Sequence, residues 1–182
     1  MTSVEYLAQG IGIVAMAFNI FSYQGKKQGT VIALQLVGGL LFAINFMLLG
    51  AWVGGVLNII AVVRAVLFLL KDKLQTQRYP WFIGFLLSYI SVYILSFTAF
   101  GVAPTPAHLV VELLPVIGMT ALHIGMMGKK ASNLRKWGLV SSPSWLIYNL
   151  VAGSWGAIIC EALTLCSIFL GMVRHDKEKQ EL

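Results

Sequence analysis

The sequence contains few charged residues. Lys, Arg, Asp and Glu together make up 11% of its 182 residues, whereas hydrophobic residues make up 58%. A soluble domain needs a polar, charged surface, and almost no sequence remains to form one once the apolar runs are set aside. The composition therefore argues against a separate soluble domain and predicts a single membrane domain over residues 1–182.

Only two cysteines are present, and both fall in the last apolar run. Cys160 and Cys166 are six residues apart, which on a helix separates their side chains by about 240° around the axis. Two such thiols cannot approach within disulfide distance of each other. We expect both to be small packing residues.

A cleavable signal peptide is not indicated either. The residues before Tyr6 carry one charged side chain, Glu5, and the first apolar run is followed by Gly25-Lys26-Lys27 rather than by a small-residue cleavage site. We expect this first run to be retained as a helix.

Long apolar runs are abundant. Seven of them approach the roughly 20 residues that a helix needs to cross a bilayer core of about 30 Å. They lie at roughly 6–23, 30–49, 52–70, 81–100, 106–127, 137–152 and 155–173. The pattern predicts an all-α integral membrane protein with seven transmembrane helices.

The positive charges follow this pattern. Twelve of the thirteen Lys and Arg residues come after the first, third, fifth or seventh run, and the remaining one, Arg64, lies within the third. Short connections rich in Lys and Arg stay in the cytoplasm, so the N-terminus is predicted outside and the C-terminus inside. Contact with anionic lipid explains the net charge of +6 without nucleic acid as a partner.

Two short motifs recur with a spacing of 103 residues. Gly25-Lys26-Lys27 matches Gly128-Lys129-Lys130, and Gly50-Ala51-Trp52 matches Gly153-Ser154-Trp155. The spacing predicts two internal repeats of three helices each, in the same orientation.

Three spans reverse the side of the membrane on which the chain lies, so a further crossing is needed between the two repeats. We assign residues 5–73 to the first repeat and residues 106–176 to the second. Residues 79–101 would form the linker helix between them, which gives a 3-1-3 arrangement.

The sequence resembles two groups of membrane proteins. Residues 145–149, WLIYN, and 161–165, EALTL, look like the WLIYG and ANIVTL stretches of semiSWEET proteins. Residues 7–12 and 111–118 more closely resemble the YgjV family of bacterial inner-membrane proteins, and this likeness covers nearly the full length. The resemblance implies a multi-pass protein of the bacterial cytoplasmic membrane with SWEET-like (MtN3-like) repeats.

The SWEET-like resemblance also implies a solute site between the two repeats. In such proteins an Asn on the third helix of each unit and a nearby Trp contact the solute, and these positions match Asn58, Glu161 and Trp145. Glu161 would bind the solute or exchange a proton, or else form an ion pair with Arg64. Trp145 is either a stacking face for a ring-shaped ligand or part of the packed core.

Arg64 lies about 9 Å further toward the cytoplasm than Asn58 on the same predicted helix. A guanidinium stays charged at any relevant pH, so Arg64 needs a carboxylate, several carbonyl groups or an anionic ligand, or must reach the inner surface. We include it in the solute site as the residue that sets the charge balance.

A second group of polar residues is a candidate entrance or gate. His108 and Glu112 are four residues apart and share one helix face, Pro115 frees a backbone carbonyl one turn earlier, and Asn19 is a polar group within the first run. Two ligands make a weak metal site, and the HExxH spacing is absent. We expect neither a metal nor a cofactor.

These patterns predict a transporter or binder of a small polar solute that works by alternating access. Two carboxyl groups, those of Glu112 and Glu161, and one guanidinium, that of Arg64, lie at membrane depth. This balance favours neutral, zwitterionic or cationic solutes over strongly anionic ones. The alternative is a non-transporting assembly protein with the same fold.

An enzyme built on His108, Glu112 and His123 is disfavoured, because His123 lies about 22 Å beyond His108 along the helix. Membrane lipids are the expected surroundings, and association into a homo-oligomer stays open.

Overall fold

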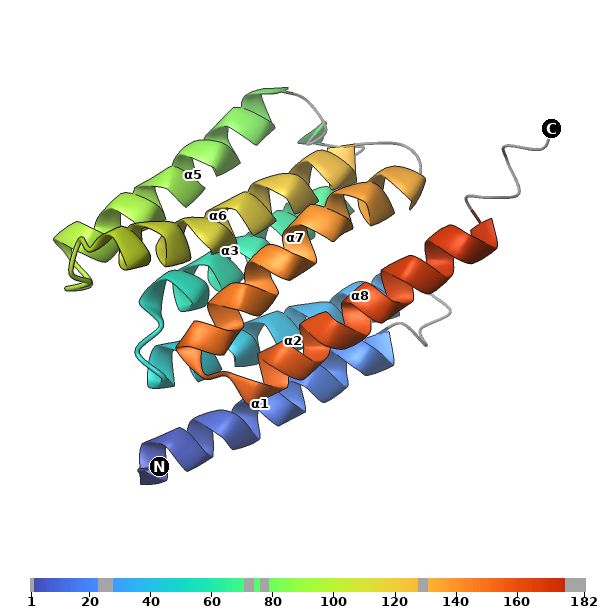
Figure 1. The fold of residues 1–182 in the computed structure, drawn as a ribbon. Helices are drawn as coiled ribbons and strands as arrows, with labels where there is room; N and C mark the ends of the chain where they lie inside the picture. The colour runs from blue at the N-terminus through green and yellow to red at the C-terminus, as the bar shows by residue number, and fades with distance from the viewer. Residues whose placement is uncertain (1, 23–27, 71–73, 76–78, 128–130, 176–182) are drawn as a thin grey trace.

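The computed structural model describes residues 2–22, 28–70, 74–75, 79–127 and 131–175 (Figure 1). Within these ranges the chain forms helices joined by short connections and no strands, which confirms the predicted all-α class. The seven long helices are α1 (Ser3–Ser22), α2 (Gln28–Leu48), α3 (Trp52–Leu69), α5 (Tyr79–Thr98), α6 (Pro106–Met127), α7 (Ala131–Ala152) and α8 (Trp155–His175).

Four of these helices, α1, α5, α6 and α8, are long and apolar enough to cross a membrane on their own. Helices α2 and α3 contain shorter apolar stretches, Ala33–Leu48 and Trp52–Phe68. The seven-span topology and the sides of the termini stay predictions. The basic residues of the connections, on which the orientation depends, lie mostly outside the described residues: Lys26, Lys27, Lys71, Lys73, Arg78, Lys129, Lys130, Lys177 and Lys179, as does the side chain of Arg174.

Helix α7 begins earlier than the sequence predicted. Its first residue is Ala131 rather than Trp137, so Arg135 and Lys136 lie on the helix and not in a connecting loop. No Gly or Pro interrupts residues 131–137, and the run therefore continues as helix at its polar end. The helix also continues through Pro143.

Glycines form tight turns at the two Gly-x-Trp motifs. Gly50 and Gly153 have φ angles of 73° and 69°, in the left-handed region that a side chain disfavours. In both turns a backbone N–H bonds to the carbonyl five residues earlier, Ala51 to Phe46 at 2.8 Å and Ser154 to Asn149 at 3.1 Å. This is the Schellman ending of a helix, and it lets α3 and α8 start at once.

Six of the helices form a closed ring. Around it α1 packs on α2, α2 on α3, α3 on α6, α6 on α7, α7 on α8, and α8 on α1. Helix α5 lies outside this ring against α3 and α6 (Figure 1). Exchanging α1, α2 and α3 with α6, α7 and α8 maps these six ring contacts onto one another.

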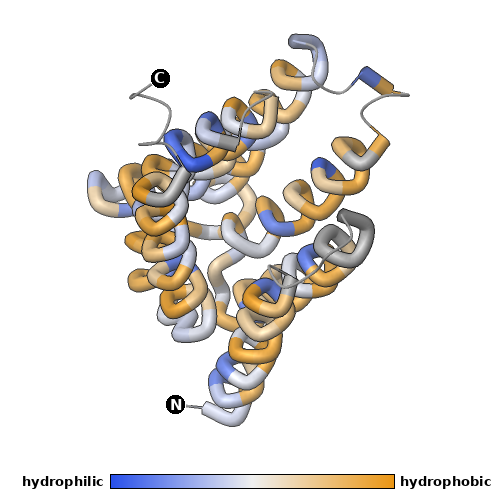
Figure 2. Tube along the Cα trace, turned by 90° about the vertical axis from the view of Figure 1, so that its right-hand side faces the viewer, coloured by the Kyte–Doolittle hydropathy of each residue, from blue (hydrophilic) through white to orange (hydrophobic). Residues whose placement is uncertain are grey.

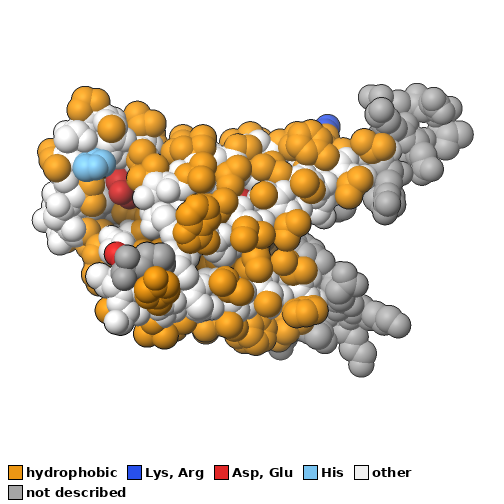
Figure 3. All heavy atoms as spheres, turned by 60° about the horizontal axis from the view of Figure 1, so that its bottom comes forward, with side chains coloured by type: hydrophobic (Ala, Val, Ile, Leu, Met, Phe, Trp, Pro, Cys, Tyr) orange, Lys and Arg blue, Asp and Glu red, His pale blue; other side chains and the backbone are white. Residues whose placement is uncertain are grey.

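The outer surface of the bundle is apolar. Figure 2 shows hydrophobic residues along the whole length of the helices, and one face in Figure 3 is covered mostly by hydrophobic side chains with few charged ones. Exposed residues include Leu87 on α5, Val110 on α6 and Phe169 on α8, with 58%, 61% and 59% of their surfaces accessible. Such a surface suits contact with lipid chains.

Candidate functional site

The ring encloses a cavity of about 560 Å³ that is lined by residues from all six of its helices and by none from α5. The four residues predicted to bind a solute, Asn58, Arg64, Trp145 and Glu161, all line it. The lining runs from Asn149 to Arg135, at opposite ends of α7. The cavity therefore extends toward the bundle end at which α2 and α7 begin.

Arg64 is the largest fully buried side chain, with 2% of its surface accessible. Its Nη1 donates to the hydroxyl of Tyr89 on α5 at 2.9 Å and to the carbonyl of Met119 on α6 at 3.2 Å. Its Nε has no hydrogen-bond partner. Both partners are neutral, so within the described residues no opposite charge pairs with this guanidinium beside the cavity.

Glu161 is not paired with Arg64 among the described residues. Its carboxyl interacts with the Ser142 hydroxyl of α7, and both residues line the cavity. The amide nitrogen of Asn58 donates to the carbonyl of Gly54 at 2.9 Å, on its own helix. Its side-chain oxygen has no partner within the described chain, which leaves it available to a cavity occupant.

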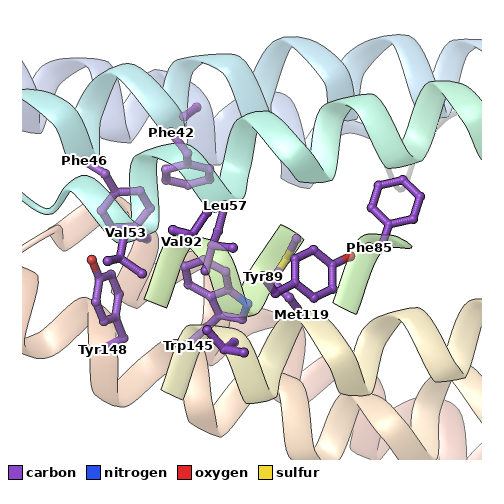
Figure 4. Close-up of a cluster of buried hydrophobic side chains, with 13 residues drawn as sticks. Phe42, Phe46, Val53, Leu57, Phe85, Tyr89, Val92, Met119, Trp145 and Tyr148 are labelled. Atoms are coloured by element: carbon purple, nitrogen blue, oxygen red, sulfur yellow. The ribbon is translucent and has the colours of Figure 1, made fainter. Parts of the chain in front are cut away.

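Trp145 belongs to the packed core as well as to the cavity wall. Its ring lies 6.2 Å from that of Phe46 and 5.9 Å, edge-on, from that of Tyr148 (Figure 4). The ring also fills the space beside Gly118 on α6, where an added Cβ would lie 2.7 Å from it. With 9% of its surface accessible, Trp145 forms a rigid wall, and both of its predicted roles fit this position.

Hydrogen bonds close the bundle at the Gly-x-Trp turns. Gln9 of α1 donates through Nε2 to the carbonyl of Gly153 at 2.6 Å, and its Oε1 accepts from the backbone N–H of Trp155 at 3.1 Å. One side chain of the first repeat thus binds the turn between α7 and α8. The contact joins the two predicted repeats at the end away from Arg135.

Two further side chains connect the two predicted repeats at the same end, and they are 103 residues apart in the sequence. Asn45 of α2 donates to the carbonyl of Ala8 at 2.7 Å and accepts from the hydroxyl of Ser154 at 2.6 Å. Tyr148 of α7 accepts through its hydroxyl from the backbone N–H of Gly54 at 2.9 Å. Each second helix therefore reaches the start of the other repeat's third helix.

At this end helices α1 and α8 approach each other closely at two glycines. A Cβ built on Gly156 of α8 would overlap the backbone carbonyl group of Gly12 on α1. Small residues permit such backbone contact between membrane helices. We call the contacts of Gln9, Asn45, Tyr148 and the Gly12–Gly156 pair the closed end.

The four predicted entrance residues do not form one group, although His108 and Glu112 are close enough for an electrostatic interaction. His108 is exposed, and its Nδ1 bonds the Ala103 carbonyl at 2.8 Å. Glu112 is partly buried, with Oε2 unpartnered, and Pro115 is buried within α6. Asn19 lines the central cavity instead, with its Nδ2 3.2 Å from the Ala15 carbonyl.

A buried histidine was not assigned to the site by sequence reasoning. His123 of α6 is fully buried and meets the ring edges of Phe68, Phe82 and Phe85 at 5.2 to 5.4 Å. Its Nδ1 lies 3.5 Å from the Tyr89 hydroxyl, the same group that binds Arg64. The sequence signal that points to this group is Tyr89, a phenol near the middle of α5.

No three His, Cys, Asp or Glu side chains of the described ranges converge as metal ligands would. His123 lies within the aromatic cluster, away from the exposed end of α6 that carries His108. The arrangement instead offers two cations, Arg64 and Arg135, one carboxyl and several amides and hydroxyls around a central space.

An apolar exterior around a ring of helices, with a central cavity lined by apolar and several polar side chains, is the arrangement of a helical membrane protein. A family model described as a bacterial inner membrane protein, Imp-YgjV, matches residues 6–179. The chain belongs to this YgjV family, which confirms the predicted location in the bacterial inner membrane. It is similar to the inner membrane protein YgjV of Escherichia coli strain K12, with 26% identity over 169 residues that cover 93% of this chain and 84% of that protein. A comparison with solved structures finds no match.

Proposed function

We propose that the chain moves a small polar solute across the inner membrane by alternating access. The first repeat, residues 5–73, would rock against the second, residues 106–176, with residues 79–101 as the linker helix. The observation that carries this proposal is the central cavity, which takes its lining from all six ring helices and none from α5.

The pattern of helix contacts supports the repeat architecture. Each contact in the ring has a counterpart when the two repeats are exchanged. The crossings by Asn45 and Tyr148 occupy matching positions as well. Solute sites at the interface of parallel repeats, near the middle of the membrane, are a feature of several transporter folds.

The closed end supports a two-state cycle. The positive-inside pattern would place it on the outer side and the other end of the cavity toward the cytoplasm, so the described conformation would face inward. Opening the closed end would break the bonds of Gln9, Asn45 and Tyr148. Each is worth about 1 kcal/mol, and a total of a few kcal/mol matches the gap between two interconverting states.

The alternative function, a non-transporting assembly protein, predicts that Arg64 and Glu161 neutralise one another in a dry core. Arg64 binds Tyr89 and Met119 instead, and both charged residues line the cavity. This arrangement favours the transport proposal over its alternative.

Uptake into proteoliposomes tests the proposal. The purified chain should accumulate or exchange at least one solute from a broad panel of sugars, polyols, amino acids and amines. Asn58→Ala and Glu161→Ala should each lower that rate at least tenfold, because both remove a polar group from the cavity wall. Ser88→Ala on α5, outside the ring, is the matched control and should transport normally. No uptake of any solute, or equal rates for all four proteins, would refute transport through this cavity.

A further inference from the structure

Arg64 and Glu161, two of the three described charged residues that line the cavity, do not form an ion pair; the third, Arg135, lines the end at which α7 begins. Arg64 on α3 is buried, with 2% of its surface accessible. Neither of its two hydrogen-bond partners carries a charge. Glu161 on α8 lines the same cavity with Ser142 as its neighbour. A buried charge is costly unless an opposite charge and hydrogen bonds satisfy it. A ligand is therefore the natural source of both missing partners.

Hydrogen-bonding atoms that have no partner lie at different levels along the cavity. The Nε of Arg64, a donor, is buried without a partner, and so is the Oδ1 of Asn149, an acceptor. Both residues line the cavity. Asn149 lies near the closed end of the bundle, and Arg64 lies about 9 Å, six helical residues, beyond the level of Asn58. The repeat match places Glu161 at the level of Asn58. The hydrogen-bond acceptors, which are the carboxylate of Glu161 and the amide oxygens, therefore occupy one part of the cavity, and the cationic donor Arg64 occupies the other.

We propose that this cavity binds a zwitterionic amino-carboxylate, with its carboxylate on Arg64 and its ammonium group on Glu161. The inference rests on the proposed function, because it names the solute class of the same cavity. A guanidinium and a carboxylate form a planar, charge-assisted pair. An ammonium group donates to Glu161 and to the oxygen atoms of Asn149 or Asn58. Met119 and Tyr89 hold the guanidinium in position from the other side.

Other solute classes satisfy only part of this arrangement. A neutral sugar would leave both charges unpaired. A simple carboxylate leaves Glu161 without a cation, and a simple amine leaves Arg64 without an anion. An amino-carboxylate neutralises both and adds no net charge to the cavity. Loss of one charge-assisted contact should weaken binding by about 10- to 100-fold.

Three four-carbon probes separate these cases: 4-aminobutyrate, butyrate and butylamine. The full chain in detergent is heated with each probe, and its melting temperature is compared with that of the unliganded protein. Glycine, β-alanine and glycylglycine vary the distance between the two charges, and glucose is the neutral comparison. We expect at least one amino-carboxylate to stabilise the protein more than butyrate, butylamine and glucose do.

Two variants test which residue binds which charged group of the ligand. In Glu161→Gln the advantage of the amino-carboxylate over butyrate should disappear. In Arg64→Gln its advantage over butylamine should disappear. Ser88→Ala should keep the wild-type ranking. If Arg64→Gln does not fold, Arg64→Lys keeps the charge and should bind the amino-carboxylate more weakly but in the same order. Equal effects of butyrate and all amino-carboxylates on the wild type, or stabilisation by glucose alone, would overturn the assignment.

Counterflow of the same compounds in proteoliposomes separates this inference from transport itself. An amino-carboxylate that stabilises the protein through Arg64 and Glu161 but shows no counterflow supports the binding site and counts against transport. Counterflow of glucose without any effect of the amino-carboxylates supports transport and overturns the solute class. Counterflow of an amino-carboxylate that is lost in Glu161→Gln supports both.

Discussion

Arg64 of α3 and Tyr89 of α5 are joined by a hydrogen bond of 2.9 Å, from the guanidinium Nη1 to the phenol oxygen. This bond attaches the helix outside the ring to the charged residue inside it. Tyr89 has 1% of its surface accessible, and its hydroxyl also lies 3.5 Å from His123 Nδ1. Helix α5 thus helps to position Arg64 in the cavity wall, although α5 does not line the cavity itself.

Tyr89→Phe should destabilise the protein. The change removes one of the two partners of a buried guanidinium, and an unsatisfied buried group of this kind costs about 1 to 3 kcal/mol. Thermal unfolding in detergent should show a lower melting temperature. Tyr93→Phe is the control from the same helix, because the Tyr93 hydroxyl bonds the Leu109 carbonyl in an exposed position. An equal fall in melting temperature in both variants would contradict the conclusion that the Tyr89 hydroxyl stabilises a buried guanidinium.

Gly156→Ala should disrupt the closed end. The added methyl group would collide with the backbone of Gly12, and backbone cannot yield as a flexible side chain can. Gly10→Ala on α1 is the matched control, since a Cβ there meets no atom within 4 Å. In a helix interior this control replacement is favourable by about 1 kcal/mol. Melting temperatures should therefore fall for Gly156→Ala and stay equal or rise for Gly10→Ala; the reverse order would exclude the close packing of α1 on α8.

Asn45→Ala and Tyr148→Phe should loosen the closed end independently. Asn45→Ala leaves the Ala8 carbonyl and the Ser154 hydroxyl without this partner, and Tyr148→Phe does the same to the Gly54 N–H. Each should cost about 1 to 3 kcal/mol of unfolding free energy. The two losses should add within about 0.5 kcal/mol, because the pairs share no partner. Strong coupling between them would mean that the two crossings form one network.

The sequence predicted the seven helices well because length and apolar content are local properties. The Gly50 and Gly153 turns were also predictable, since only glycine suits a φ near +70°. The start of α7 was wrong by six residues, because the position of basic residues indicates a membrane side and not the end of a helix.

The candidate site was predictable only in part. Asn58, Glu161 and Trp145 came from a family resemblance and Arg64 from its charge, and all four line one cavity. The partners of Arg64 were missed, because Tyr89 and Met119 are 25 and 55 residues away in the chain and only the packing of α5 and α6 on α3 brings them close. His108 and Glu112 share a helix face, but the histidine forms its hydrogen bond with the backbone carbonyl of Ala103.

Cysteine labelling tests the cavity most directly. Thr164→Cys on α8 places a thiol in the cavity wall, and Phe169→Cys places one on the exposed apolar face of the same helix. Both are made with Cys160 and Cys166 replaced by alanine. A hydrophilic, membrane-impermeant thiol reagent should label Thr164→Cys in inside-out vesicles at least tenfold faster than in right-side-out vesicles, and should label Phe169→Cys in neither. Labelling of Thr164→Cys from neither side, or faster labelling from outside, would contradict a polar cavity that is closed at the Gly-x-Trp turns and accessible from the cytoplasm.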